Sequence, residues 1–181
     1  MLKKTNKYIL IALVLALLSC NNSNDKNNQN KKLNFKKYKK HLLEANKHLV
    51  KTESQEIEDY IKRYNWDMKQ TKTGLRYMIY KHGKGVKAEE GKTAKINYTV
   101  ELINGALCYS SEKDGPKEFV IGKRNVEAGL EQGVSLMRVG DRAKLIIPSY
   151  LAFGLIGDQN RIPKKATLIY DINLLEIKKI N

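Results

Sequence analysis

The sequence predicts one antiparallel α+β domain, in which a short helix lies across a sheet, preceded by an N-terminal helical arm. Residues 93–102 and 167–177 alternate apolar and polar side chains, which is typical of half-buried strands. Residues 122–141 instead show the spacing of an amphipathic helix, with strand-like runs on both sides. A chain of 181 residues is long enough for one such domain with extensions.

The helix within 122–141 carries four apolar residues at spacings of four, four and three: Val126, Leu130, Val134 and Met137. Gly129 and Gly133 are poor helix formers, each costing about 1 kcal/mol relative to Ala. Two of them in one short helix indicate that something packs close against its backbone. Gly140 and Asp141 predict that the helix ends at a C-cap glycine. Periodicity alone indicates a core helix.

The other strands and connections are apolar runs bounded by turn residues. In chain order they are a strand over 75–80, a turn at Asn104-Gly105, a short strand over 117–121, a strand over 142–148 and a long loop over 150–163. Strands that surround one helix and are joined by short turns favour an antiparallel α+β arrangement.

The N-terminus has the layout of a secretory signal peptide. Three lysines precede an apolar run over 8–18, which is too short to span a bilayer as a helix. The run ends in the motif LLSC at Cys20, which resembles a bacterial lipobox. We therefore expect residues 1–19 to be a lipoprotein signal peptide, and Cys20 to carry the acyl chains, palmitate among them, that anchor the protein to a membrane. The alternative is an ordinary signal peptide with an incidental cysteine.

Two segments separate this signal from the globular domain, which is expected over 71–181. Residues 20–32 are polar and low in complexity, which predicts a disordered tether. Residues 33–70 predict a helical arm of two helices or one bent helix, because apolar residues recur there at helical spacing. The arm is either a dimerisation or partner-binding surface, or an extension packed on its own domain.

The net charge of +15 does not by itself indicate nucleic-acid binding. The excess is mostly lysine scattered along the chain, without an arginine-rich stripe and without a zinc-binding or RNA-binding signature. We interpret the charge as a compositional bias and expect no nucleic-acid partner.

The sequence contains no familiar catalytic set. His41, His48 and His82 have neither metal-ligand spacing nor a partner nucleophile. Cys108 is the one cysteine left once Cys20 is acylated, and without a nearby histidine it is expected to be a small buried hydrophobe. Any enzymatic activity must therefore need no nucleophile and no metal.

Several motifs resemble the FKBP-type peptidyl-prolyl cis-trans isomerases. They run in register over about 75–179, as INYT from Ile96, FVIG from Phe119, VEAGLEQG from Val126, VGDRAK from Val139 and IP at Ile162. The glycine-containing helix followed by Val-Gly-Asp-x-Ala is specific to that family. The lipobox, the tether and residues 58–80 also resemble the gliding-motility-associated lipoproteins of the Bacteroidetes, which carry such a domain.

The resemblance implies an antiparallel sheet of five or six strands wrapped around the short helix, with an apolar pocket for a proline ring between them. It implies catalytic roles for Tyr98, Phe153 and Tyr170. The residues that it implies for substrate binding are Phe119, Val126, Glu127 through its backbone, Leu130 as the floor, Ile162 and Tyr109. The implied partners are proline-containing polypeptide segments, and no cofactor is implied.

The chain also departs from the family pattern. Cys108 and Tyr109 stand where an aromatic residue and an aspartate are usual, and Phe153 stands where a tyrosine hydroxyl binds the substrate. Leu130 replaces a tryptophan floor, and Lys117 replaces an aromatic residue at the rim. These departures favour, as the alternative, a non-catalytic proline-binding chaperone or interaction module.

The expected function is thus rotamase activity on X–Pro bonds that assists the folding of exported or cell-envelope proteins, with gliding-motility components among the candidate clients. The expected location is the cell envelope, at the periplasmic side of a membrane reached through the N-terminal lipid. A homodimer formed through the helical arm is the remaining expectation about partners.

Overall fold

A computed structural model describes residues 25–179, with side chains from residue 35 onward. The chain divides into two compact units, residues 1–48 and 49–181. The expected signal peptide and the lipidation site at Cys20 lie outside the described residues. Within the described part, no helix is long and apolar enough to cross a membrane.

The arm is one continuous helix, α2 (Asp25–Tyr64), where two helices or a bent helix were expected. No glycine or proline interrupts it. Residues 25–32, which were predicted to belong to a disordered tether, also contain no glycine or proline, and they form the first part of α2. Asn65, directly after the helix, has a left-handed φ of 51°. The Asn65 N–H donates to the Lys62 carbonyl and the Trp66 N–H donates to the Ile61 carbonyl, which is a Schellman-type helix end.

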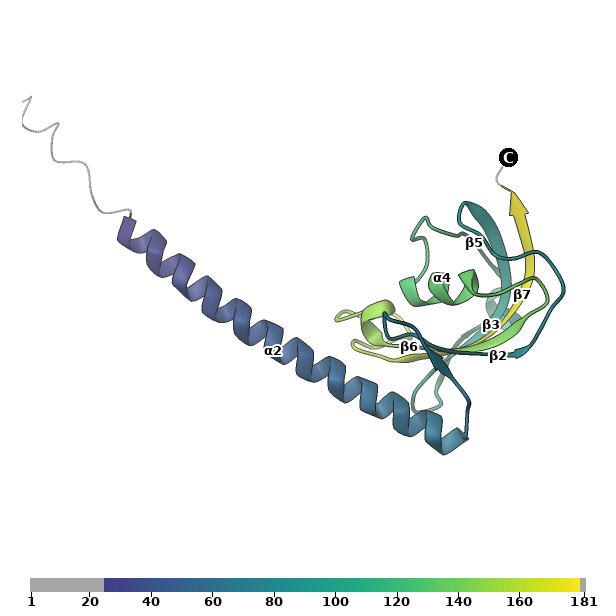
Figure 1. The fold of residues 1–181 in the computed structure, drawn as a ribbon, viewed down its shortest axis with the longest axis horizontal. Coiled ribbons are helices and arrows are strands. Elements are labelled where there is room, and N and C mark those ends of the chain that lie inside the picture. The colour runs from purple at the N-terminus through teal and green to yellow at the C-terminus, as the bar shows by residue number, and fades with distance from the viewer. Residues whose placement is uncertain (1–24, 180–181) are drawn as a thin grey trace, which may run out of the picture. The chain divides into compact units, whose positions relative to one another are not determined.

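The globular unit is an antiparallel sheet that curves around the short helix α4 (Figure 1). Its strands are β1 (Lys69–Gln70), β2 (Arg76–Lys81), β3 (Lys92–Leu102), β4 (Leu107–Ser110), β5 (Lys117–Val120), β6 (Arg142–Ile147) and β7 (Leu168–Lys179). Their order is β1-β2-β6-β7-β3-β4, and β5 pairs with β3 beside this path. The predicted fold is confirmed. The sheet has seven strands instead of five or six because the chain leaving α2 adds the two-residue β1 at the β2 edge.

Two glycines let α4 (Ala128–Ser135) lie directly on the sheet. A Cβ at Gly129 would overlap the Ile147 side chain, and one at Gly133 would overlap the Leu145 side chain. The expectation that something packs against the helix backbone is therefore confirmed, and the neighbour is β6. Leu130 and Val134, on the same face, are fully buried in the main core.

The predicted C-cap at Gly140 is wrong, because α4 ends earlier, at Leu136. Gly140 has a φ of +91° and lies in the turn that leads into β6. Asp141, which is buried, organises this turn by accepting hydrogen bonds from the N–H groups of Gly83 at 2.6 Å and Arg138 at 2.7 Å. The glycine thus serves the turn and not the helix.

The last turns of α2 belong to the globular unit and cover part of the other face of the sheet. Ile57 and Tyr60 form a second apolar cluster with Ile146 and Ile169. Arg76, which is buried, donates to Ser54 at 2.7 Å and Glu58 at 3.0 Å on the helix. Two short elements remain. They are α3 (Ser111–Asp114), between β4 and β5, and a 3-10 turn at Ser149–Leu151, which follows β6.

Truncating Ile57 tests this second cluster. Ile57 is 0% exposed, so Ile57→Ala should lower the free energy of unfolding by about 2–5 kcal/mol through lost apolar contact and the cavity left behind. Urea denaturation measures the change, with Lys51→Ala at an exposed position of the same helix as the control. An unchanged midpoint for Ile57→Ala would mean that the helix end does not stabilise the sheet.

Candidate functional site

The residues expected in the pocket meet where the start of α4 faces the inner side of the sheet. Tyr98 comes from β3 and Tyr170 from β7, and their ring centroids lie 6.3 Å apart. Leu130, on α4, is fully buried in the same cluster. This cluster also contains Phe119, Ile162 and, partly buried, Val126, Phe153 and Tyr109. The structure therefore places these residues in one apolar core, to which β3, β4, β5, α4, β7 and the long loop contribute.

Strand alternation places the two tyrosines on the helix side of the sheet. In β3, Ile96, Tyr98 and Val100 are buried, whereas the residues between them are only half-buried. Antiparallel pairing sets Val100 opposite Tyr170 in β7. The period of two thus directs both rings toward α4, as the sequence pattern predicted.

Glu127 contributes its side chain to the site as well as its backbone. The Tyr170 hydroxyl donates a 2.7 Å hydrogen bond to Glu127 Oε1, and Glu127 is only 9% exposed. Burial, followed by the charge of Glu127 and this hydrogen bond, raises the pKa of Tyr170 well above its ordinary value. The one sign of this pair in the sequence is Glu127 itself, an acidic residue at the start of an apolar helix. An apolar site therefore contains one fixed polar pair.

Tyr109, which is half-buried, connects β4 to the long loop. Its hydroxyl donates to Asp158, which also accepts from the N–H groups of Asn160 and Ile162. The hydrogen bond to Asp158, followed by burial, raises the pKa of Tyr109. The guanidinium of Arg161 lies 4.9 Å from the Tyr109 ring centroid. These contacts hold Ile162 in the wall of the site.

Cys108 and Lys117 occupy the edge of the site. Cys108 is buried, and its burial raises the pKa of the thiol, as expected for a small hydrophobe without a reactive thiolate. The Lys117 ammonium lies 5.1 Å from the centroid of the Tyr98 ring. A cation therefore lies over one of the two central tyrosines.

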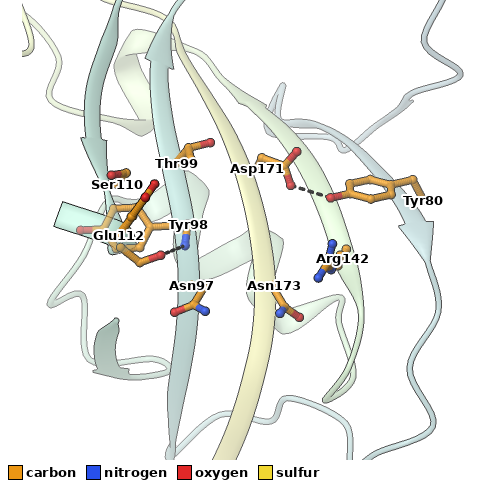
Figure 2. Close-up of a pocket in the computed structure, with 10 residues that line it drawn as sticks. Tyr80, Asn97, Tyr98, Thr99, Ser110, Glu112, Arg142, Asp171 and Asn173 are labelled. Atoms are coloured by element: carbon orange, nitrogen blue, oxygen red, sulfur yellow. Dashed lines mark hydrogen bonds between the residues drawn. The ribbon is translucent and has the colours of Figure 1, made fainter. Parts of the chain in front are cut away.

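A polar hollow of about 340 Å³ lies over β2, β3, β6 and β7, and residues of β4 and α3 also line it (Figure 2). Neighbouring strand residues point to opposite faces, so Asn97 and Thr99 of this hollow lie across the sheet from the buried ring of Tyr98. Asp171 in the hollow already accepts hydrogen bonds from Tyr80 and Lys144, both at 2.7 Å. Tyr98 also lines the hollow, so the hollow adjoins the apolar site. In the described part of the chain, no group of three or more His, Cys, Asp or Glu side chains is placed to hold a metal.

The Tyr170–Glu127 pair predicts a pH-dependent contribution to stability. Tyr170→Phe leaves a buried carboxylate without its donor, so we expect unfolding to become easier by about 1–3 kcal/mol near neutral pH. The pKa of Tyr170 is raised in the fold, so this contribution is complete below pH 10 and is lost as the unfolded tyrosine ionises above it. Denaturant titrations of both proteins from pH 7 to 11 measure the difference. A difference that stays constant over this range would contradict the assignment.

Comparisons with known proteins agree with this arrangement. Residues 84–175 match the family model described as FKBP-type peptidyl-prolyl cis-trans isomerase. The chain is 38% identical over 113 residues to the FKBP-type peptidyl-prolyl cis-trans isomerase FkpA of Aeromonas hydrophila, covering 62% of this chain and 41% of that protein. It is 44% identical over 93 residues to FK506-binding protein 2 of Dictyostelium discoideum, covering 51% of this chain and 70% of that protein.

Two crystal structures show the same fold. FkpA from Escherichia coli aligns with a TM-score of 0.63 and 29% identity, covering 96% of this chain and 82% of that chain. AtFKBP13 aligns with a TM-score of 0.58 and 29% identity, covering 61% of this chain and 98% of that chain. The chain spans only 20% of the length of one curated relative, FK506-binding protein 4 of Emericella nidulans, with 42% identity over 98 residues.

Proposed function

We propose that this chain, which belongs to the FKBP-type peptidyl-prolyl cis-trans isomerase family, catalyses rotation about X–Pro peptide bonds. The observation that carries the proposal is the apolar site in which Tyr98 and Tyr170 lie beside the buried Leu130. A proline ring is apolar and compact, and it suits a site of this composition. Neither a nucleophile nor a metal is needed for this reaction.

The chemistry depends on the barrier and not on the equilibrium. Rotation about a peptide bond is opposed by about 18–20 kcal/mol because resonance is lost in the twisted state. The cis and trans forms of an X–Pro bond differ by only about 0.5–1 kcal/mol. The twisted amide has less charge separation than either planar form, so a dry apolar site stabilises it selectively. A backbone N–H beside Glu127, at the start of α4, would hold the substrate carbonyl.

A non-catalytic proline-binding module remains the second candidate, and two features favour it. Phe153 has no hydroxyl to offer a substrate. The hydroxyl of Tyr109 is engaged by Asp158. Both features remove polar contacts near a twisting amide while leaving the apolar walls in place. A protease-free assay of cis-to-trans conversion in a Leu-Pro peptide distinguishes a catalyst from a binder.

Phe153→Tyr tests the catalytic role of the loop. The change restores a hydroxyl at the position where the family binds the substrate carbonyl. A neutral hydrogen bond contributes roughly 0.5–1.5 kcal/mol, so we expect the isomerisation rate to rise about threefold to tenfold at equal folded concentration. Phe35→Tyr adds the same hydroxyl on the exposed part of α2 and serves as the matched control.

Two results would contradict parts of this proposal. If the wild type is fully active and Phe153→Tyr leaves the rate unchanged, Phe153 does not occupy the expected position in the loop. If neither protein accelerates the reaction or binds proline peptides, the isomerase proposal fails. Binding without acceleration would establish the interaction module instead.

We also propose that the protein is anchored in the cell envelope through lipid on Cys20 and acts on exported or envelope proteins. The support is the order of features at the N-terminus, where a basic start is followed by an apolar run and then by the LLSC motif. Gliding-motility components are proposed clients on the resemblance of the N-terminal half to lipoproteins of that class. A lipid anchor would place the isomerase unit where exported chains fold.

Replacing the anchor residue tests this location. Cys20→Ala should release the protein from the membrane fraction, because stable attachment requires the acyl chains that this cysteine would carry. Fractionation after a high-salt wash measures the change, and Cys108→Ala is the control because that thiol is buried in the domain. A Cys20→Ala protein that stays in the washed membranes would reject lipid anchoring.

A homodimer through α2 is a further part of the proposal. Phe35, Leu42 and Leu49 recur every seven residues on this helix, which is the period of a coiled-coil seam. Phe35 is 70% exposed and Leu42 is 64% exposed, and Tyr38, Leu43 and Val50 are exposed apolar neighbours. Pairing with a second copy would bury these side chains. The mass in solution should be that of two chains.

A further inference from the structure

One carboxylate on α2 holds both ends of the loop that carries part of the apolar site. Glu53 accepts a hydrogen bond from the Ser149 N–H at 2.6 Å and another from the Ser149 hydroxyl at 3.0 Å. It also accepts from the Thr167 hydroxyl at 2.7 Å. Ser149 follows the end of β6, and Thr167 immediately precedes β7. A single side chain therefore fixes the entry and the exit of residues 150–166.

The segment between these two ends supplies Phe153 and Ile162 to the site. Its interior has its own bonds, because the Lys165 N–H donates to the Gly154 carbonyl at 2.8 Å and Asp158 N–H donates to the Ile162 carbonyl at 3.1 Å. The loop thus has an internal framework. Near Ile162 it is held to β4 by the Tyr109–Asp158 and Arg161–Cys108 hydrogen bonds, whereas the placement of the part that carries Phe153 depends on how the loop ends are held. Glu53 acts at those ends.

The fold does not need Glu53 to keep α2 in place. The buried Arg76 binds Ser54 and Glu58, and Ile57 packs on the sheet, so two other interactions fix the same stretch of helix. Loss of the Glu53 contacts should therefore release the loop ends without releasing the helix. Hydrogen bonds to a carboxylate are stronger than neutral ones, and an amide in its place cannot accept at two oxygen atoms.

We propose that Glu53 is a positioning residue for the isomerase site, which makes the C-terminal part of α2 a functional element of that site. The inference rests on the proposed isomerase function. Glu53 binds the two ends of the loop, and it acts by setting where Phe153 stands relative to Tyr98 and Leu130. A misplacement of about 1 Å in such walls is enough to cost catalysis on the order of a hundredfold.

The test compares Glu53→Gln with Glu56→Gln, and the second change removes an exposed carboxylate from the same helix. The measurements are kcat and KM for a Leu-Pro peptide, the unfolding midpoint, and the amide chemical shifts of residues 150–166. We expect Glu53→Gln to lower kcat/KM by about tenfold or more, with an unchanged midpoint and with shift changes concentrated in the loop. Glu56→Gln should match the wild type in all three.

A double-mutant cycle separates positioning from general stability. In a Ser149→Ala/Thr167→Val background, Glu53→Gln should have a smaller effect on kcat/KM than in the wild type, because the two hydroxyl partners are absent and only the Ser149 N–H contact remains. Full activity of folded Glu53→Gln, or a loss of activity that only follows loss of folded protein, would overturn the proposal. If the wild type accelerates nothing, the isomerase function fails. The amide chemical shifts of residues 150–166 then test by themselves whether Glu53 positions the loop. Unchanged shifts in Glu53→Gln would reject that role.

Discussion

The close approach of α4 to β6 is the constraint on which the rest of the domain depends. It is possible because Gly129 and Gly133 present bare backbone to the side chains of Ile147 and Leu145. A helix held at this distance lets the sheet curve around it (Figure 1), and Leu130 on this helix is fully buried. The helix start then faces Tyr98 and Tyr170. The glycines cost helix propensity, and the interior packing they permit offsets that cost.

The site combines apolar walls with a small number of fixed polar groups. Glu127 lies in the apolar cluster only because the Tyr170 hydroxyl satisfies it, since an unpaired buried carboxylate is strongly unfavourable. Asp158 has a corresponding role on the loop, where it binds the Tyr109 hydroxyl and two backbone N–H groups. These bonds orient the walls and leave the ring faces of the tyrosines as the apolar surface. A site that twists an amide needs such walls to be rigid.

The two faces of the sheet have different functions in this molecule. The inner face forms the core and the site with α4. The outer face is covered in part by Ile57 and Tyr60 of α2, and its uncovered part is the polar hollow of Figure 2. Through Glu53 the helix on the outer face also reaches the loop that completes the inner site. The arm and the domain are therefore connected by specific hydrogen bonds as well as by apolar packing.

The sequence by itself determined the fold class and the inward direction of most wall residues. Alternation in 93–102 and 167–177 directs Tyr98 and Tyr170 inward, and the glycine pair indicates the helix contact, because both signals report local geometry. Local signals misassigned Gly140 as a helix cap and predicted two helices or a bent helix where α2 is one continuous helix. Only the tertiary structure decided that Glu127 pairs with Tyr170, 43 residues away, and that Glu53 binds Ser149, 96 residues away. No periodicity encodes such partners, because they depend on where separately formed elements come to rest against one another.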